Sequence, residues 1–204
     1  MTEKNIEKER ILSFCSEKFL KEGFHKTTMD EIARNLKISK KTIYKYYSSK
    51  NKLVDEITAG VLNSVASEYK KITNNKDENA VIKLINISRF ILKRLMTINA
   101  VFFDDLKQKH PERWNEVIKT RRKIIQKNMG GIMEQGQKED LIIARPIPLM
   151  LKIMTSAIDG SINPEFLMNN DISAKKAGET TIEIIFNGIL TKKGKKIFSQ
   201  IKPG

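Results

Sequence analysis

The 204-residue chain is poor in the residues that build covalent or metal-bound frameworks. Its single cysteine, Cys15, excludes an intrachain disulfide. The place of Cys15 on the apolar face of an expected helix predicts a small buried residue rather than a redox sensor. No uninterrupted apolar run approaches the roughly 18 residues of a membrane span, and the charged segment from Glu3 to Arg10 has no apolar signal core. We therefore expect a cytoplasmic protein.

The sequence also lacks the patterns on which most enzyme chemistry depends. Its two histidines, His25 and His110, fall in different expected elements. There is no pair of residues with metal-ligand spacing, no nucleophile elbow and no glycine-rich phosphate loop. The sequence therefore predicts no enzyme, no catalytic residue, no metal and no cofactor.

Negative charge is scarce compared with positive charge. The net charge is +14 and the pI is near 9.7, which predicts an acidic partner, with nucleic acid ahead of an anionic membrane. The charge is denser near the N-terminus, where residues 1–50 contain 12 basic and 7 acidic side chains. The basic segment from Lys192 to Lys202 is interpreted as a solvated end rather than a second binding site.

Residues 28–50 have the pattern of two short helices joined by a tight turn. Thr28 and Glu31 have capping-box spacing, so a helix is expected to begin at Thr28. Ser39 supplies a second N-cap three residues after Leu36, the last apolar position of that helix. Two helices this close in sequence must cross steeply, so the segment predicts a helix-turn-helix.

The second of these helices is expected to present a basic outer surface. Ile43 and Tyr47 are four residues apart and can face inward together. From Arg34 to Val54 the sequence contains seven lysine and arginine residues and no aspartate or glutamate. One-signed charge beside a short exposed helix suits a phosphate backbone and a major groove.

The N-terminal quarter of the chain resembles the TetR/AcrR family of bacterial transcriptional regulators. The resemblance rests on Ile11-Leu12, Cys15, Phe19, Gly23-Phe24, Thr27-Thr28, Ile32-Ala33, Ile38-Ser39, Thr42-Ile43-Tyr44, Tyr47, Lys50 and Leu53. It implies a homodimer in which the last two long helices, here about Pro148 to Ser161 and Ala174 to Leu190, form a four-helix interface with their copies. The residues after the first quarter do not extend the resemblance, so it implies no particular ligand.

Three residues depart from the usual family pattern. Lys37 stands where a glycine commonly closes the first helix, Lys41 where a glycine is common, and Tyr47 where phenylalanine is usual. At the first position a residue with a side chain would have to adopt a left-handed backbone conformation. The other two add polar surface.

The predicted DNA-contacting residues come from the helix-turn-helix and the segment that follows it. Lys40, Lys41 and Thr42 are the expected base readers, and the other members are expected to bind phosphates. A solvated lysine face and a purely capping Thr28 are the alternatives that involve no DNA. The whole set is Thr28, Lys40, Lys41, Thr42, Tyr44, Lys45, Tyr46 and Lys50.

The remaining sequence has helical periodicity and no convincing strand pattern. A long helix started by Ser49, a helix over Val81 to Leu95, a short one over 99–109 and a long one over 114–137 are expected, followed by two more that end near Gly160 and Leu190. The predicted fold is all-α, with a helix-turn-helix DNA-binding domain over residues 1–66 and a larger helical effector-binding and dimerisation domain over residues 67–204.

The second domain contains a set of methionine and aromatic residues. Methionine adapts to irregular volumes, so a pocket for an apolar effector is a reasonable prediction, with ordinary core packing as the alternative. Asp104 and Asp105 are interpreted as a solvated pair near a helix end, with ligand orientation as the alternative. The predicted lining residues are Phe90, Met96, Phe102, Phe103, Trp114, Met133, Met150 and Met154.

Together these features predict a ligand-responsive, sequence-specific, homodimeric regulator that binds double-stranded operator DNA. We expect a repressor released from a palindromic operator by a small apolar effector. A DNA-binding structural protein without an effector response is the alternative, favoured by the diffuse positive charge. The capped recognition helix favours sequence readout.

Overall fold

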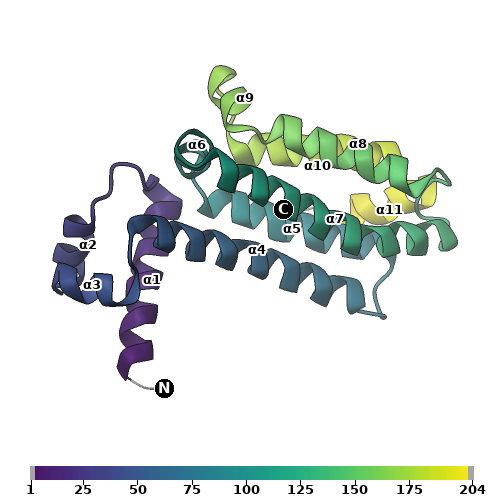
Figure 1. The fold of residues 1–204 in the computed structure, drawn as a ribbon. Helices are drawn as coiled ribbons and strands as arrows, with labels where there is room; N and C mark the ends of the chain where they lie inside the picture. The colour runs from purple at the N-terminus through teal and green to yellow at the C-terminus, as the bar shows by residue number, and fades with distance from the viewer. Residues whose placement is uncertain (1–2, 202–204) are drawn as a thin grey trace. The chain divides into compact units, whose positions relative to one another are not determined.

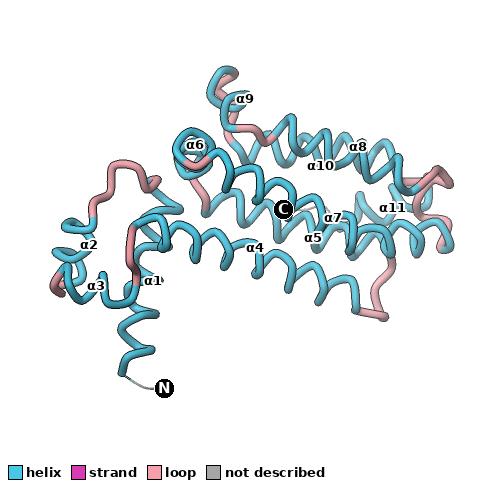
Figure 2. The backbone as a smooth tube through the Cα atoms, in the orientation of Figure 1, coloured by secondary structure: helices cyan, strands magenta, loops and turns pink. Residues whose placement is uncertain are grey.

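A computed structural model describes residues 3–201 of the chain (Figure 1). Within that range it contains helices and no strand, as predicted; one antiparallel bridge pairs Ile142 with Leu190. Figure 2 shows that the connections between helices are short. No helix among residues 3–201 has the length and apolarity to cross a membrane. The helices are α1 (Glu3–Glu22), α2 (Met29–Leu36), α3 (Lys40–Tyr46), α4 (Lys50–Asn74), α5 (Ala80–Thr97), α6 (Ala100–Lys109), α7 (Pro111–Lys138), α8 (Ile147–Ser161), α9 (Pro164–Asn169), α10 (Ala174–Ile189) and α11 (Lys192–Ile201).

The helices form two compact units, which we call the head and the body. The head contains the described residues up to Asn63 together with Thr97–Val117, and the body contains Ser64–Met96 together with the described residues from Ile118 onward. α6 therefore belongs to the head, although nearly all of α5, which precedes it in the sequence, belongs to the body. The division of function at residues 66 and 67 stays a prediction.

The core of the head is built from α1, α2, α3, α4, α6 and the loop after α1. Ile11 and Cys15 are four residues apart on α1 and are fully buried, beside Ile32 of α2 and Ile43 of α3. The loop residue Phe24 is 1% exposed. Further members come from α6, which places its apolar face in the same cluster: Phe102 and Leu106.

Cys15 behaves as predicted for a small apolar residue. Its side chain is buried, and that burial raises the pKa of the thiol to about 12. The reactive form of a cysteine is the thiolate, so Cys15 is inert at neutral pH.

The body has its own apolar core, to which α5, α7, α8 and α10 contribute. α7 runs through Gly130 and Gly131 without a break. Three of the predicted effector-lining residues are buried in this core, with relative exposures of 0% to 6%: Met133, Met150 and Met154.

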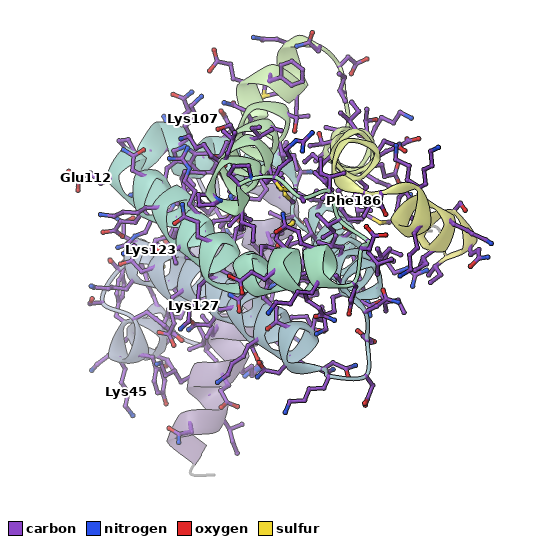
Figure 3. The ribbon with its side chains drawn as sticks, turned by 90° about the vertical axis from the view of Figure 1, so that its right-hand side faces the viewer. Lys45, Lys107, Glu112, Lys123, Lys127 and Phe186 are labelled. Carbon is purple, nitrogen blue, oxygen red and sulfur yellow. The ribbon has the colours of Figure 1, made fainter. Side chains whose placement is uncertain are left out.

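The prediction of a solvated basic end holds for the exposed lysines but misses the apolar side of residues 192–201. They form α11, and the ring of Phe198 lies 5.1 Å from that of Phe186 in an edge-to-face contact (Figure 3 labels Phe186). Ile197 and Ile201 are four residues apart and also pack against the body core. The lysines occupy the other face of this amphipathic helix, and their number hides its short apolar stripe in the sequence. Residues 202–204 of the predicted segment lie outside the described residues.

Candidate nucleic-acid interface

The first helix of the helix-turn-helix begins as predicted. The Thr28 hydroxyl accepts a hydrogen bond from the backbone N–H of Glu31 at 3.1 Å. The pKa of the Glu31 carboxyl is lowered, chiefly by its hydrogen bond from Lys18, and the backbone N–H of Thr28 contributes to the lowering. Both residues of the capping box therefore act at the start of α2.

The turn between α2 and α3 has the left-handed residue that the sequence requires. Lys37 has φ 54° and ψ 41°, and the N–H of Ile38 reaches back to the carbonyl of Ala33 at 3.0 Å. Arg10 of α1 donates to the carbonyl of Leu36 at 2.8 Å, which satisfies another free acceptor at this helix end. Ser39 then caps α3 by accepting from the N–H of Thr42 at 3.0 Å. The steep turn is thus fixed by backbone and side-chain hydrogen bonds.

The strained position gives a direct test of this turn. We expect Lys37→Gly to raise the free energy of unfolding by about 1 kcal/mol. A left-handed conformation costs a residue with a Cβ ~1–2 kcal/mol, and glycine avoids this cost. Part of the stabilisation is offset because glycine makes the unfolded chain more flexible. Denaturant unfolding measures the change. Lys37→Ala removes the same charge and keeps the strain, so equal stabilities of the two variants would contradict the explanation.

The exposed face of α3 contains the predicted DNA-contacting residues. Ile43 and Tyr47 are buried, at 0% and 2% exposure, and so face inward as predicted. Lys41 and Lys45 are exposed, and Tyr44 is 44% exposed. Figure 3 shows Lys45 at the surface of the molecule. The face of α3 that is free for a partner is therefore basic and aromatic.

Tyr47 stands where the family usually has phenylalanine, and its hydroxyl makes a hydrogen bond inside the head. It donates to the backbone carbonyl of Lys8 at 3.4 Å, and the Lys8 ammonium lies 5.5 Å from the centre of the ring. Burial raises the pKa of the Tyr47 hydroxyl. This departure therefore joins α3 to α1 and adds no polar surface.

The side chains on the exposed face differ in how they are held. The Lys40 ammonium lies 2.9 Å from a carboxylate oxygen of Asp30, which raises the pKa of Lys40. The hydroxyl of Thr42 lies 2.8 Å from that of Ser39. The Lys45 ammonium is 5.8 Å from the centre of the Tyr46 ring. Lys40 must leave Asp30, or share it, to contact DNA.

Lys50 is engaged with the protein itself. Its ammonium donates to the backbone carbonyls of Phe24, His25 and Thr27 at 3.0, 3.0 and 2.9 Å. Burial lowers the pKa of Lys50, and the nearby Asp105 carboxylate opposes that lowering. The assignment of Lys50 to a phosphate stays a prediction.

The predicted effector-lining residues fall into different parts of the chain. Phe102, Phe103 and Trp114 pack in or against the head core, whereas the three methionines noted above lie in the body core. Met96 is 65% exposed. Phe90 is partly buried, with the Arg94 guanidinium 6.0 Å from the centre of its ring. The structure does not gather these residues into one cluster, and their role in a pocket stays a prediction.

A cleft of about 480 Å³ lies in the head beside the end of α3. Its charged groups are already paired, since Arg113 lies 2.7 Å from Asp55 and Lys8 lies 3.0 Å from Glu56. Its lining therefore offers an effector no unpaired charge. Its lining residues are Tyr46, Tyr47, Ser48, Lys52, Asp55, Glu56, Ala59 and Arg113.

Two short capped helices, a tight turn and a basic exposed face on the second helix define a helix-turn-helix DNA-binding protein. A family model described as "Bacterial regulatory proteins, tetR family" matches residues 11–57, which include all of these elements. The chain belongs to the TetR family of DNA-binding transcriptional regulators. This family is non-enzymatic, and the chain is a regulator rather than an enzyme.

Relatives and solved structures extend the similarity beyond the helix-turn-helix. An uncharacterized HTH-type transcriptional regulator of Bacillus subtilis, YvaF, is 24% identical over 88% of this chain and 94% of its own length. The TetR-family regulator PfmR from Thermus thermophilus is 17% identical, with a TM-score of 0.61, over 87% of this chain and 97% of its own. A TetR regulator from Legionella pneumophila is 18% identical, with a TM-score of 0.65, over 89% of this chain and 96% of its own. At these identities the solved structures show that the fold is shared.

Proposed function

We propose that the protein is a sequence-specific regulator that inserts α3 into the major groove of an operator. The observation that carries the proposal is the capped α2–α3 pair with its exposed basic face. In helix-turn-helix proteins the first residues of the second helix contact base edges. Lys40, Lys41 and Thr42 hold those positions here, and Tyr44, Lys45 and Tyr46 follow them along the exposed face toward the phosphates. Thr28 adds a hydroxyl and the free N–H groups at the start of α2.

We infer that two copies associate through α8 and α10 to form a homodimer. Both helices expose large apolar side chains in the single chain: Ile153 of α8 is 59% exposed and Ile184 of α10 is 68% exposed. Gly160 and Gly188 also have open space around them, which leaves room for a close approach of another helix. Exposed apolar side chains on two helices that contact each other support an interaction surface at this place. A symmetric dimer would meet half-sites about 34–36 Å apart on a palindromic operator.

We further propose that the regulator is a repressor and that a small apolar effector binds the body and releases it from DNA. The methionines of the body core supply adaptable apolar volume. The Nε atom of Arg121 on α7 is buried without a hydrogen-bond partner among the described residues, and it offers a donor to a polar group of such an effector. Thermal-shift screening with lipophilic compounds, followed by operator titration with and without each hit, tests this part of the proposal.

Selection of bound duplexes from a random pool tests sequence-specific binding. We expect a palindrome. With the selected duplex, Thr42→Ala should relax preference at one position per half-site and cost ~1–3 kcal/mol for the preferred base, because a base contact is lost. Tyr44→Phe should weaken all duplexes about equally, since a phosphate contact carries no sequence information.

The same titrations separate this function from that of a structural DNA-binding protein. Affinities for the selected and random duplexes must be compared at one fixed salt concentration, because phosphate contacts make all of them salt-dependent. Equal affinities would exclude sequence readout. Identical specificity profiles for the Thr42 and Tyr44 variants would exclude the assignment of these two residues.

A further inference from the structure

The loop between α1 and α2 is held by two side chains of opposite charge from other helices. One carboxylate oxygen of Asp105, on α6, accepts hydrogen bonds from the backbone N–H groups of Phe24 and His25 at 2.6 and 2.8 Å. The ammonium of Lys50, at the start of α4, donates to the carbonyls of Phe24, His25 and Thr27. Five backbone groups of a segment without secondary structure are thus satisfied by two residues, which we call the loop clamp.

α6 lies directly against this loop. Gly23 has φ +82°, and a Cβ at that position would lie 2.6 Å from the Asp105 carboxylate and 2.7 Å from the side chain of Val101. Only glycine meets both the left-handed conformation and this close approach. The backbone N–H of Asn99, just before α6, also donates to the carbonyl of Leu20 near the end of α1 at 2.7 Å. α6 therefore contacts the loop and the helix that precedes it.

The loop leads straight into the helix-turn-helix. Thr27 is 5% exposed, and the next residue is the N-cap of α2. α2 is in turn fixed to α3 by the left-handed turn at Lys37. The conformation of the loop thus sets where α2 begins, and with it the orientation of both helices on the head. Hydrogen bonds to charged groups are the stronger kind, so the loop clamp is well suited to select one conformation.

We propose that Asp105 and Lys50 are positioning residues for DNA recognition: they hold the α1–α2 loop in the conformation that presents α3 to the operator, and neither contacts DNA. The inference rests on the operator binding proposed above. For Lys50 it replaces the phosphate contact predicted from the sequence, because the three carbonyls already occupy its three donors.

The loop clamp also makes the head sensitive to the position of α6. A displacement of α6 by about 1 Å away from the loop would stretch both Asp105 bonds beyond the limit of a hydrogen bond. The backbone N–H of Phe24, a buried residue, would then need a new partner, and that of His25 would be left to water. The DNA-binding geometry of the head therefore depends on a helix that lies outside the helix-turn-helix in the sequence.

The test uses the full-length chain and the duplex selected from the random pool. Asp105→Ala is expected to weaken binding of that duplex by roughly 10-fold or more, since two charge-assisted bonds are lost. Asp105→Asn keeps an acceptor without the charge and should restore part of the affinity. Asp104→Ala is the matched control: it removes a carboxylate from the neighbouring position of α6, and Asp104 takes no part in the hydrogen bonds and ion pairs of the described residues.

Amide hydrogen exchange distinguishes a local effect on the loop from a general loss of stability, which would speed exchange throughout the head. The N–H groups of Phe24 and His25 should exchange faster in the Asp105 variants, while core amides of α1 keep the wild-type rate. If Asp105→Ala does not fold, Asp105→Asn carries the same comparison. A folded variant that binds the duplex within twofold of wild type, or leaves both amides protected, would overturn the inference.

The salt dependence of binding separates the two roles of Lys50. Lys50→Met keeps most of the apolar stem and should weaken binding without changing the slope of log affinity against log salt, because no phosphate contact is lost. A slope reduced by about one unit would overturn the positioning role and restore the phosphate contact. If the wild-type chain shows no preference for any duplex, the proposed function itself fails, and that result is distinct from a failure of the Asp105 and Lys50 variants.

Discussion

Ile184→Glu is expected to convert the protein to monomers and to weaken operator binding by roughly 100-fold or more, because a dimer gains that much from binding two half-sites with linked heads. Ile184 is 68% exposed on α10, so its replacement leaves the core of the single chain intact. In the proposed dimer the new carboxylate would be buried against the partner copy without a counter-charge, which is strongly unfavourable. Sedimentation equilibrium measures the association and fluorescence anisotropy measures the binding.

Met168→Glu is the control for this variant. Met168 is 65% exposed and lies on α9, so the substitution adds the same charge at a similarly exposed apolar position outside α8 and α10. It should leave both association and DNA affinity close to wild type. An Ile184→Glu protein that remains dimeric and binds the operator normally would place the dimer interface elsewhere.

Phe102→Ala should lower the free energy of unfolding of the head by about 3–5 kcal/mol. Phe102 is 3% exposed, and its ring makes edge-to-face contacts with Phe24 at 5.7 Å and Phe103 at 5.9 Å. Its loss leaves a cavity between α6 and the loop that precedes α2. The single tryptophan, Trp114, lies 6.2 Å from Phe103 in the same unit, so its fluorescence during denaturant unfolding reports on the head.

Phe166→Ala is a matched change in the body, where the side chain is 43% exposed. A surface substitution of this kind typically changes stability by less than about 0.5 kcal/mol. If Phe102→Ala cost no more than that, α6 would not be part of the core of the head. If α6 is part of this core, a fragment ending at residue 66 should fold poorly, because it lacks Phe102 and the carboxylate of Asp105.

The parts of the fold that the sequence predicted well are those in which the interacting residues are close in the chain. Thr28, Ser39 and Ser173 each cap a helix by accepting from the N–H group three residues later, and such a pattern is visible in any window of the sequence. The inward positions of Ile43 and Tyr47 follow from helical spacing for the same reason.

The parts that were missed depend on residues far apart in the chain. Asp105 and the loop it holds are about 80 positions apart, and no spacing rule relates an expected solvated carboxylate to a particular pair of N–H groups. The pairing of Lys40 with Asp30 joins two helices whose relative rotation is set by the turn at Lys37. Sequence patterns predicted the exposed basic face of α3, whereas tertiary contacts decided which of its lysines are free.

The buried thiol of Cys15 makes this protein well suited to site-directed spectroscopy. Cys15 is fully buried, and that burial raises the pKa of its thiol, so we expect it to react slowly with maleimide or methanethiosulfonate reagents in the folded protein. A spin label or a fluorophore would therefore attach only to a cysteine introduced elsewhere, with no need to replace the native one. In the proposed dimer, one label per copy at an exposed position of the body unit such as Lys127 would report the distance between the two copies directly, with and without DNA.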